Sequence, residues 1–243
     1  MPAALDIRPI KADEWKASLD DVKAVLHSAA SELWKHFPDR KLDPILVEPK
    51  GGPIVLFRRG KNGEYFVRLN TGQTYWAQYS YQFAHELCHI LCGYREGEAH
   101  NKWFEESLCE LASLYVLRQM GQTWKMRPPY SNWKGYAKAL TGYADERMSK
   151  VKLAEEMTLA KWYADNAEQL RKSATQRELN QVVATLLLPL FEKEPSHWEA
   201  ITWLNAGEHV KDRDFPAYLS AWHANVPQKH QELVAEIAKE RVI

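Results

Sequence analysis

The chain has 243 residues, enough for one large domain or for two lobes around one cleft. Lysine and arginine together number 32, as do aspartate and glutamate, so the formal net charge is zero. This balance argues against a nucleic-acid-binding protein that relies on bulk positive charge. The longest strongly apolar run, residues 182–191, is about half as long as the roughly 20 residues of a membrane-spanning helix, so no membrane span is expected.

The N-terminus and the cysteines bear on the cellular compartment. The first residues have no basic start followed by an apolar stretch, so no signal peptide is recognised. The odd number of cysteines (Cys88, Cys92 and Cys109) fits a reducing compartment better than a disulfide framework. We therefore expect a cytoplasmic protein; a secreted or periplasmic location is the alternative for a chain that has lost a signal peptide. The cysteines are interpreted as small buried apolar side chains.

The first third of the chain predicts one helix followed by a small sheet. Apolar residues recur at helical spacing over residues 11–37, and Pro38 closes that segment. Short β-branched or aromatic runs then predict strands, and the Gly60–Gly63 segment is typical of a hairpin connection. The expected strands are residues 44–48, 54–58 and 65–69, with a fourth within 73–79.

From about Ser80 onward the pattern is helical. A first helix should end near Gly93, and a second should run from a cap at Asn101 to Met120, with Gly121 after it. Further helices are expected at about 131–145, 146–172, 174–193, 196–205, 215–225 and 228–240. We therefore predict an α+β fold: residues 1–121 form a lobe with a small sheet, and residues 122–243 form an all-helical lobe.

The first of these helices carries the sequence His85-Glu86-Leu87-Cys88-His89. Residues four apart lie on one face of a helix, so His85 and His89 can hold one metal ion together. Neutral imidazole is a good ligand for Zn²⁺. Glu86 lies one step round the helix, where it can accept a proton from a metal-activated water.

A catalytic zinc site needs a third protein ligand. A third histidine in the extended His-Glu-x-x-His-x-x-Gly-x-x-His pattern is excluded, because Arg95 stands at its last position. An aspartate is disfavoured, because none occurs between Asp43 and Asp145. Cys92 shares the face of the two histidines but would need a distorted helix to reach the same ion.

A glutamate on the next helix is the preferred third ligand. Most of that helix is apolar, and Glu106, Cys109, Glu110 and Ser113 form a narrow polar stripe on it. Two carboxylates four residues apart on a buried face repel each other and are costly to desolvate, and a metal ion with a histidine N–H would remove both problems. We assign Glu106 as the ligand and Glu110 as the acceptor for the free ring N–H of a ligating histidine, His85 in our assignment. Glu105 is the main rival for the ligand role.

At this point the sequence resembles the zincin metallopeptidases, and within them the gluzincins. The resemblance covers residues 80–120. It implies a zincin-like fold in which His85, His89 and Glu106 bind Zn²⁺, Glu86 is the general base and Glu110 supports a histidine. The Gly-Ala-Met-Glu-Asn signature of the aminopeptidase branch is absent, so aminopeptidase specificity is not carried over.

The function expected from these residues is zinc-dependent hydrolysis of peptide bonds in a peptide or protein substrate. One alternative is a zincin-fold protein that binds a metal or a partner without turnover. Another is a helical interaction module in which His85 and His89 are ordinary core residues. The side chain that would stabilise the oxyanion is left open among Tyr130, Tyr136, Tyr143, His209 and His223.

Overall fold

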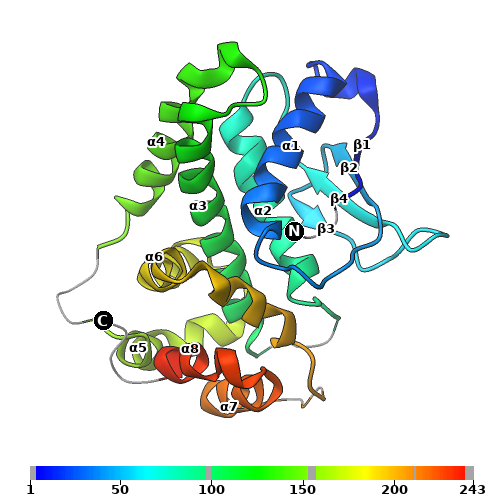
Figure 1. Ribbon diagram of the computed structural model, residues 1–243. Helices are drawn as coiled ribbons and strands as arrows, with labels where there is room; N and C mark the ends of the chain where they lie inside the picture. Colours follow the sequence, from blue (N-terminus) through cyan, green and yellow to red (C-terminus); the bar gives the residue numbers. More distant parts are fainter. Residues whose placement is uncertain (1–3, 97–99, 153–156, 209, 211, 239–243) are drawn as a thin grey trace. The chain divides into compact units, whose positions relative to one another are not determined.

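The computed structural model describes residues 4–96, 100–152, 157–208, 210 and 212–238 (Figure 1). The chain forms two compact units. The first comprises Met1–Cys88 and Ala112–Glu146, and the second comprises His89–Leu111 and Arg147–Ile243. Two long helices contribute residues to both units. The boundary after residue 121 that the sequence suggests stays a prediction.

The first unit contains a four-stranded mixed sheet in the order β1-β2-β4-β3. The strands β1 and β2 are parallel, β2 and β4 are parallel, and β3 is antiparallel to β4. Their bounds are β1 Ile7–Pro9, β2 Ile45–Pro49, β3 Ile54–Val55 and β4 Tyr65–Leu69. The predicted hairpin at Gly60–Gly63 is confirmed by the backbone bond from Gly60 N–H to Glu64 O (2.9 Å). The α+β class is confirmed as well.

The helix α1 (Leu19–Trp34) lies beside the sheet in Figure 1 and contacts β1. It is shorter than the predicted 11–37, and a 3₁₀ turn, η1 (Ala12–Glu14), precedes it. Val22, Leu26, Ala29 and Leu33 are fully buried. These are the positions that the 3.6-residue period assigns to the core-facing side.

The predicted strand within residues 73–79 is wrong, because α2 (Trp76–Leu91) already begins there. The aromatic residues that favoured a strand instead form a cluster at helical spacing. The ring centroids of Trp76 and Tyr79 are 5.2 Å apart, and Tyr79 lies 5.5 Å from Trp15. Burial of these rings overrides the local preference of aromatic residues for strands.

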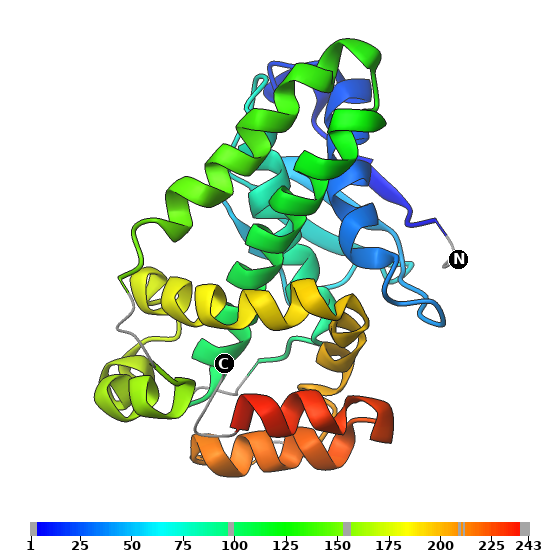
Figure 2. The same ribbon diagram turned by 60° about the vertical axis from the view of Figure 1, so that its left-hand side comes forward.

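The helix α3 (Lys102–Met126) continues well past the predicted stop at Gly121. Gly121 faces α4 (Ala137–Met148), which returns alongside α3 after the 3₁₀ helix η2 (Ser131–Tyr136) (Figure 2). A Cβ atom on Gly121 would lie 2.4 Å from Cγ2 of Thr141. The glycine therefore permits a close helix–helix approach and does not end the helix.

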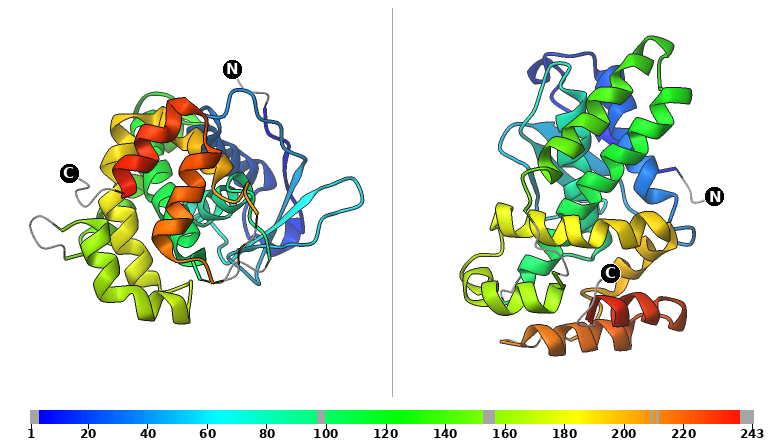
Figure 3. Two further views of the ribbon diagram at one scale, coloured as in Figure 1. Left: turned by 90° about the horizontal axis from the view of Figure 1, so that it is seen from below. Right: turned by 90° about the vertical axis from the view of Figure 1, so that its left-hand side faces the viewer.

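The second unit is built from helices. They are α5 Leu159–Lys172, α6 Arg177–Lys193, η3 Pro195–Trp203, α7 Phe215–Asn225 and α8 Gln228–Ala238. Figure 3 shows α7 and α8 side by side. The predicted start of α7 is confirmed, because the Asp214 side chain accepts a bond from Ala217 N–H (2.8 Å).

The helix predicted over 146–172 is in two pieces: α4 ends at Met148 and α5 begins at Leu159. Residues 153–156 and 239–240, also predicted as helical, lie outside the described residues. Within the described part of the chain, no helix combines the length and apolar character needed to cross a membrane.

An aromatic cluster holds the first turns of α3 in the second unit. Trp103 is fully buried, with its ring 4.6 Å from Phe215 and 5.4 Å from Tyr163, centroid to centroid. The side chain of Asn180 donates to the Trp103 carbonyl (3.0 Å) and to the Ser107 hydroxyl (3.1 Å). The helix segment that follows Trp103 carries Glu105, Glu106 and Cys109, so this packing fixes the position of those side chains.

Candidate metal centre

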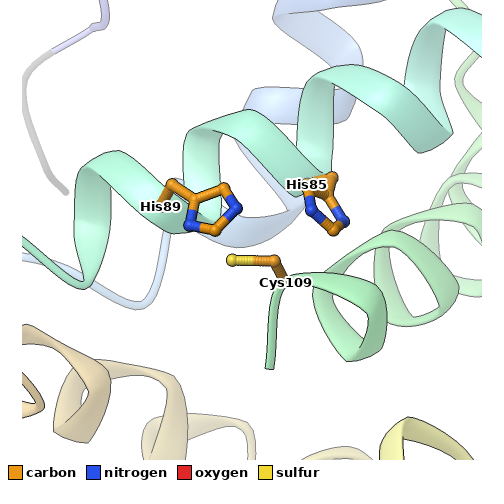
Figure 4. A group of neighbouring side chains, drawn as sticks. All are labelled: His85, His89 and Cys109. Carbon is orange, nitrogen blue, oxygen red and sulfur yellow. The ribbon is translucent and has the colours of Figure 1, made fainter. Parts of the chain in front are cut away.

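His85 and His89 lie one turn apart on α2, and Figure 4 shows their rings on the same side of the helix. Phe83, Leu87 and Ile90 form a buried apolar face of this helix, roughly opposite the two histidines. His89 is buried, at 7% exposure, whereas His85 is half-buried. Glu86 is 3% exposed. The two imidazoles and the carboxylate that the sequence analysis identified thus lie on one continuous helix of 16 residues.

The two nitrogens of His89 face two different carboxylates. Nδ1 lies 2.6 Å from Oε1 of Glu105, a hydrogen-bond distance. Nε2 lies 3.6 Å from Oε2 of Glu106. A neutral imidazole carries one N–H and one lone pair. With Nδ1 donating to Glu105, the lone pair is on Nε2 and points toward Glu106.

The separation of His89 and Glu106 fits two ligands of one ion. In a tetrahedral zinc site with ordinary Zn–N and Zn–O bond lengths, the ligating nitrogen and oxygen lie about 3.4 Å apart. The distance between Nε2 and Oε2 is 3.6 Å. This is longer than a hydrogen bond and close to the ligand–ligand distance. His89 and Glu106 can therefore bind the same metal ion with only small side-chain movements.

The surroundings of His89 carry negative charge. Burial alone would lower the pKa of His89, but the hydrogen bond to Glu105 and the negative charges of Glu105 and Glu106 outweigh it and raise the pKa well above its ordinary value. A buried carboxylate (Glu105) and a half-buried one (Glu106) that face one imidazole favour a compensating positive charge. A proton on the ring or a divalent cation between Nε2 and Glu106 can supply that charge.

Glu105 is hydrogen-bonded to His89 through one carboxylate oxygen and to Asn205 through the other. The side-chain amide of Asn205 donates to Oε2 of Glu105 (2.7 Å) and to the backbone carbonyl of Cys92 (3.2 Å). Both oxygens of Glu105 are thus engaged, one by His89 and one by Asn205. Sequence reasoning missed Asn205, since it lies 100 residues beyond Glu105 and no motif marks it.

Cys109 joins the two histidines. One potential ligand atom from each of His85, His89 and Cys109 lies within 4.8 Å of the others. Figure 4 shows the Cys109 side chain projecting from α3 toward the histidines of α2. The sequence interpretation treated this cysteine as an apolar core residue. The signal that could have identified it is its place in the polar stripe, three residues after Glu106.

The remainder of the polar stripe is buried. Glu110 is 9% exposed, and the Ser113 hydroxyl donates to the backbone carbonyl of Tyr81 (2.8 Å). The burial explains why these polar groups occur in an otherwise apolar helix: each needs a partner inside the protein. The predicted hydrogen bond from His85 to Glu110 stays a prediction, as does the choice of Glu106 over Glu105 as ligand.

Two of the candidates for oxyanion stabilisation, Tyr136 and Tyr143, make contacts within the first unit. The hydroxyl of Tyr136 accepts a bond from Ala77 N–H (3.4 Å), and the ring of Tyr143 packs edge-on against Tyr81. Both contacts are typical of packed aromatic side chains. His209 lies outside the described residues.

Comparison with known proteins adds no further assignment. The chain matches no protein-family model, no curated protein and no solved structure.

Proposed function

We propose that this protein is a zincin-like zinc metallopeptidase that hydrolyses peptide bonds. The observation that carries the proposal is the His-Glu-x-x-His sequence on the buried helix α2, with His89 Nε2 3.6 Å from the Glu106 carboxylate of α3. Under this proposal His85, His89 and Glu106 bind Zn²⁺, Glu86 is the general base, and Glu110 orients His85.

The donor set fits Zn²⁺. Imidazole nitrogens and a carboxylate oxygen are ordinary zinc ligands, and three protein ligands leave one position open for chemistry. When bound, the zinc ion would act as a Lewis acid and lower the pKa of a coordinated water to about 7. The hydrogen bond between His89 Nδ1 and Glu105 fixes which ring nitrogen remains available as a ligand.

Glu86 moves the proton in this mechanism. Its carboxylate accepts a proton from the attacking water and then donates it to the nitrogen of the leaving amine. Glu86 is 3% exposed, so its carboxylate is largely shielded from bulk water. General acid–base catalysis needs such a group to be protonated in one step and ionised in the other.

The zinc content of the purified protein tests the proposal first. We expect about one zinc ion per wild-type chain and a loss of bound zinc in His89→Ala, because a catalytic site with two remaining ligands binds zinc weakly. His223→Ala, on α7, is the matched control and should keep its zinc. Elemental analysis after dialysis measures both. A wild-type protein with no affinity for zinc would sink the proposal.

Cleavage of casein or a peptide library tests the activity separately. Turnover by the zinc-loaded protein supports the metallopeptidase. Zinc binding without turnover supports instead the alternative of a zincin-fold protein that binds a metal or a partner. A protein with neither zinc binding nor peptide cleavage supports the third alternative, a helical interaction module in which His85 and His89 are ordinary core residues.

Removal of the Glu105 carboxylate should weaken zinc binding without removing a ligand. We expect Glu105→Ala to lower zinc affinity roughly 10–100-fold, the usual cost of losing the partner that orients a metal-binding histidine. Asn205→Ala should give a smaller loss, since it leaves the bond between His89 and Glu105 in place. Competition with a chromogenic chelator measures both affinities. Wild-type affinity in Glu105→Ala would show that this hydrogen bond does not orient His89.

A further inference from the structure

We propose that Cys109 is a thiolate ligand of the metal ion held by His85 and His89. This inference rests on the proposed metal site and adds a donor that the His-Glu-x-x-His motif does not contain. The sulfur is one of three potential ligand atoms that lie within 4.8 Å of one another, the others being nitrogens of the two histidines (Figure 4).

The geometry permits ligation after a small adjustment. Ordinary Zn–S and Zn–N bond lengths place the sulfur and nitrogen of a tetrahedral site roughly 3.6 Å apart. The observed separations are bounded at 4.8 Å. Rotation about the single bonds of the cysteine and histidine side chains can close a difference of this size. Cys109 projects from α3 on the side that faces the histidine pair.

Under the proposed function Glu106 binds the same ion as Cys109, although the three ligand atoms that lie within 4.8 Å of one another are those of His85, His89 and Cys109. Glu106 and Cys109 are three residues apart on α3 and therefore lie on one face of that helix. The shell then contains two imidazoles, one carboxylate and one thiolate. Four protein donors are typical of a closed zinc site, whereas three leave a position for water. Cys109 therefore closes the resting site, and hydrolysis requires the thiolate to leave the ion.

Cys109 would bind the metal as a thiolate, and a thiolate ligand favours some metal ions over others. Binding converts the Cys109 thiol and the aqueous ion to a metal–thiolate bond, and the thiol proton is released to solvent. Thiolate is a soft donor that favours Zn²⁺ and related transition ions over Mg²⁺ and Ca²⁺. Cys109 is fully buried, which keeps water away from the metal–sulfur bond.

Cobalt substitution tests the inference with the full chain. Cobalt(II) bound to a thiolate gives a near-ultraviolet charge-transfer band that imidazole and carboxylate ligands do not give. We expect this band in the wild-type protein loaded with Co²⁺ and its loss in Cys109→Ser and Cys109→Ala. Cys88→Ala and Cys92→Ala are matched controls, since both cysteines are also fully buried, and they should retain the band.

Two outcomes separate this inference from the proposed function. Bound Co²⁺ without the charge-transfer band in the wild type would overturn the thiolate ligand and leave the His85, His89 and Glu106 site standing. No binding of Co²⁺ or Zn²⁺ to the wild type would overturn both. Two cysteine replacements are used so that a folding defect in one, checked by circular dichroism, does not decide the result.

Metal affinity gives a second readout. Loss of a direct ligand should cost more than the roughly 10–100-fold typical of an outer partner, so Cys109→Ala should bind Zn²⁺ more weakly than Glu105→Ala does. Equal zinc affinity in Cys109→Ala and wild type would contradict the inference. The same variant, saturated with zinc, should hydrolyse peptides faster than wild type because a position on the ion is open. A slower rate at saturation would contradict closure of the resting site.

Discussion

Replacement of Glu86 by glutamine is expected to lower kcat for peptide hydrolysis about 10²–10⁴-fold, the usual contribution of a general acid–base group. Glutamine keeps nearly the same shape but cannot accept and return a proton at neutral pH. Bound zinc should remain near one ion per chain, because Glu86 is not among the proposed ligands. The measurement is steady-state peptide cleavage by zinc-loaded protein, with zinc content determined on the same sample.

Glu32→Gln is the control for this replacement. Glu32 is also a buried glutamate, at 5% exposure, but it lies on α1 and pairs with Lys35 (2.6 Å). Its loss should leave kcat unchanged. If Glu86→Gln hydrolyses peptides at the wild-type rate, Glu86 is not the general base. If Glu86→Gln loses its bound zinc, the Glu86 carboxylate acts on the metal site and not on the proton.

Replacement of Trp103 by alanine is expected to destabilise the protein by about 3–5 kcal/mol, the range for large aromatic residues in cores. The ring is fully buried and contacts Phe215, Tyr163 and Phe104 at centroid distances of 4.6, 5.4 and 5.6 Å. Its loss leaves a cavity beside the first turn of α3. Urea unfolding followed by circular dichroism measures the change in free energy of unfolding.

Phe57→Ala is the control, because Phe57 is 47% exposed and a surface replacement usually changes stability by less than about 0.5 kcal/mol. Trp103→Phe retains part of the ring contacts, so its loss of free energy of unfolding should lie between those of Trp103→Ala and Phe57→Ala. A loss below about 1 kcal/mol in Trp103→Ala would mean that neighbouring rings collapse into the cavity, since relaxation reduces the cost of such replacements.

The sequence predicted the local elements that carry strong periodicity. Helix α1 shows Val22, Leu26 and Leu33 on its buried side, as the spacing predicted, and β4 has the predicted bounds of Tyr65–Leu69. The hairpin at Gly60–Gly63 and the start of α7 at Asp214 also follow from local chemistry. These features depend on neighbours within a few residues, which is the range over which a sequence pattern carries information.

Two errors come from tertiary packing. The segment around Trp76 looked like a strand, but its rings pack against Tyr79 and, through it, Trp15 within a helix. Gly121 looked like a helix stop, but it is a point of close approach to α4. In both cases a contact with a residue distant in sequence outweighs the local preference. Strand β1, with three residues, was too short to predict.

For the candidate site, the sequence by itself determined that His85, Glu86 and His89 lie together, because four-residue spacing on a helix fixes that geometry. It also identified the polar stripe of α3. Only the tertiary structure decided which side chains of α3 meet the histidines: Glu106 and Cys109 from the stripe, and Glu105 from beside it. Glu105 lies at Nδ1 of His89, Glu106 faces Nε2, and Cys109 lies within reach of both rings. The physical reason is that the rotation of α3 about its own axis is set by packing of residues such as Trp103 and Asn180, whose partners lie far along the chain.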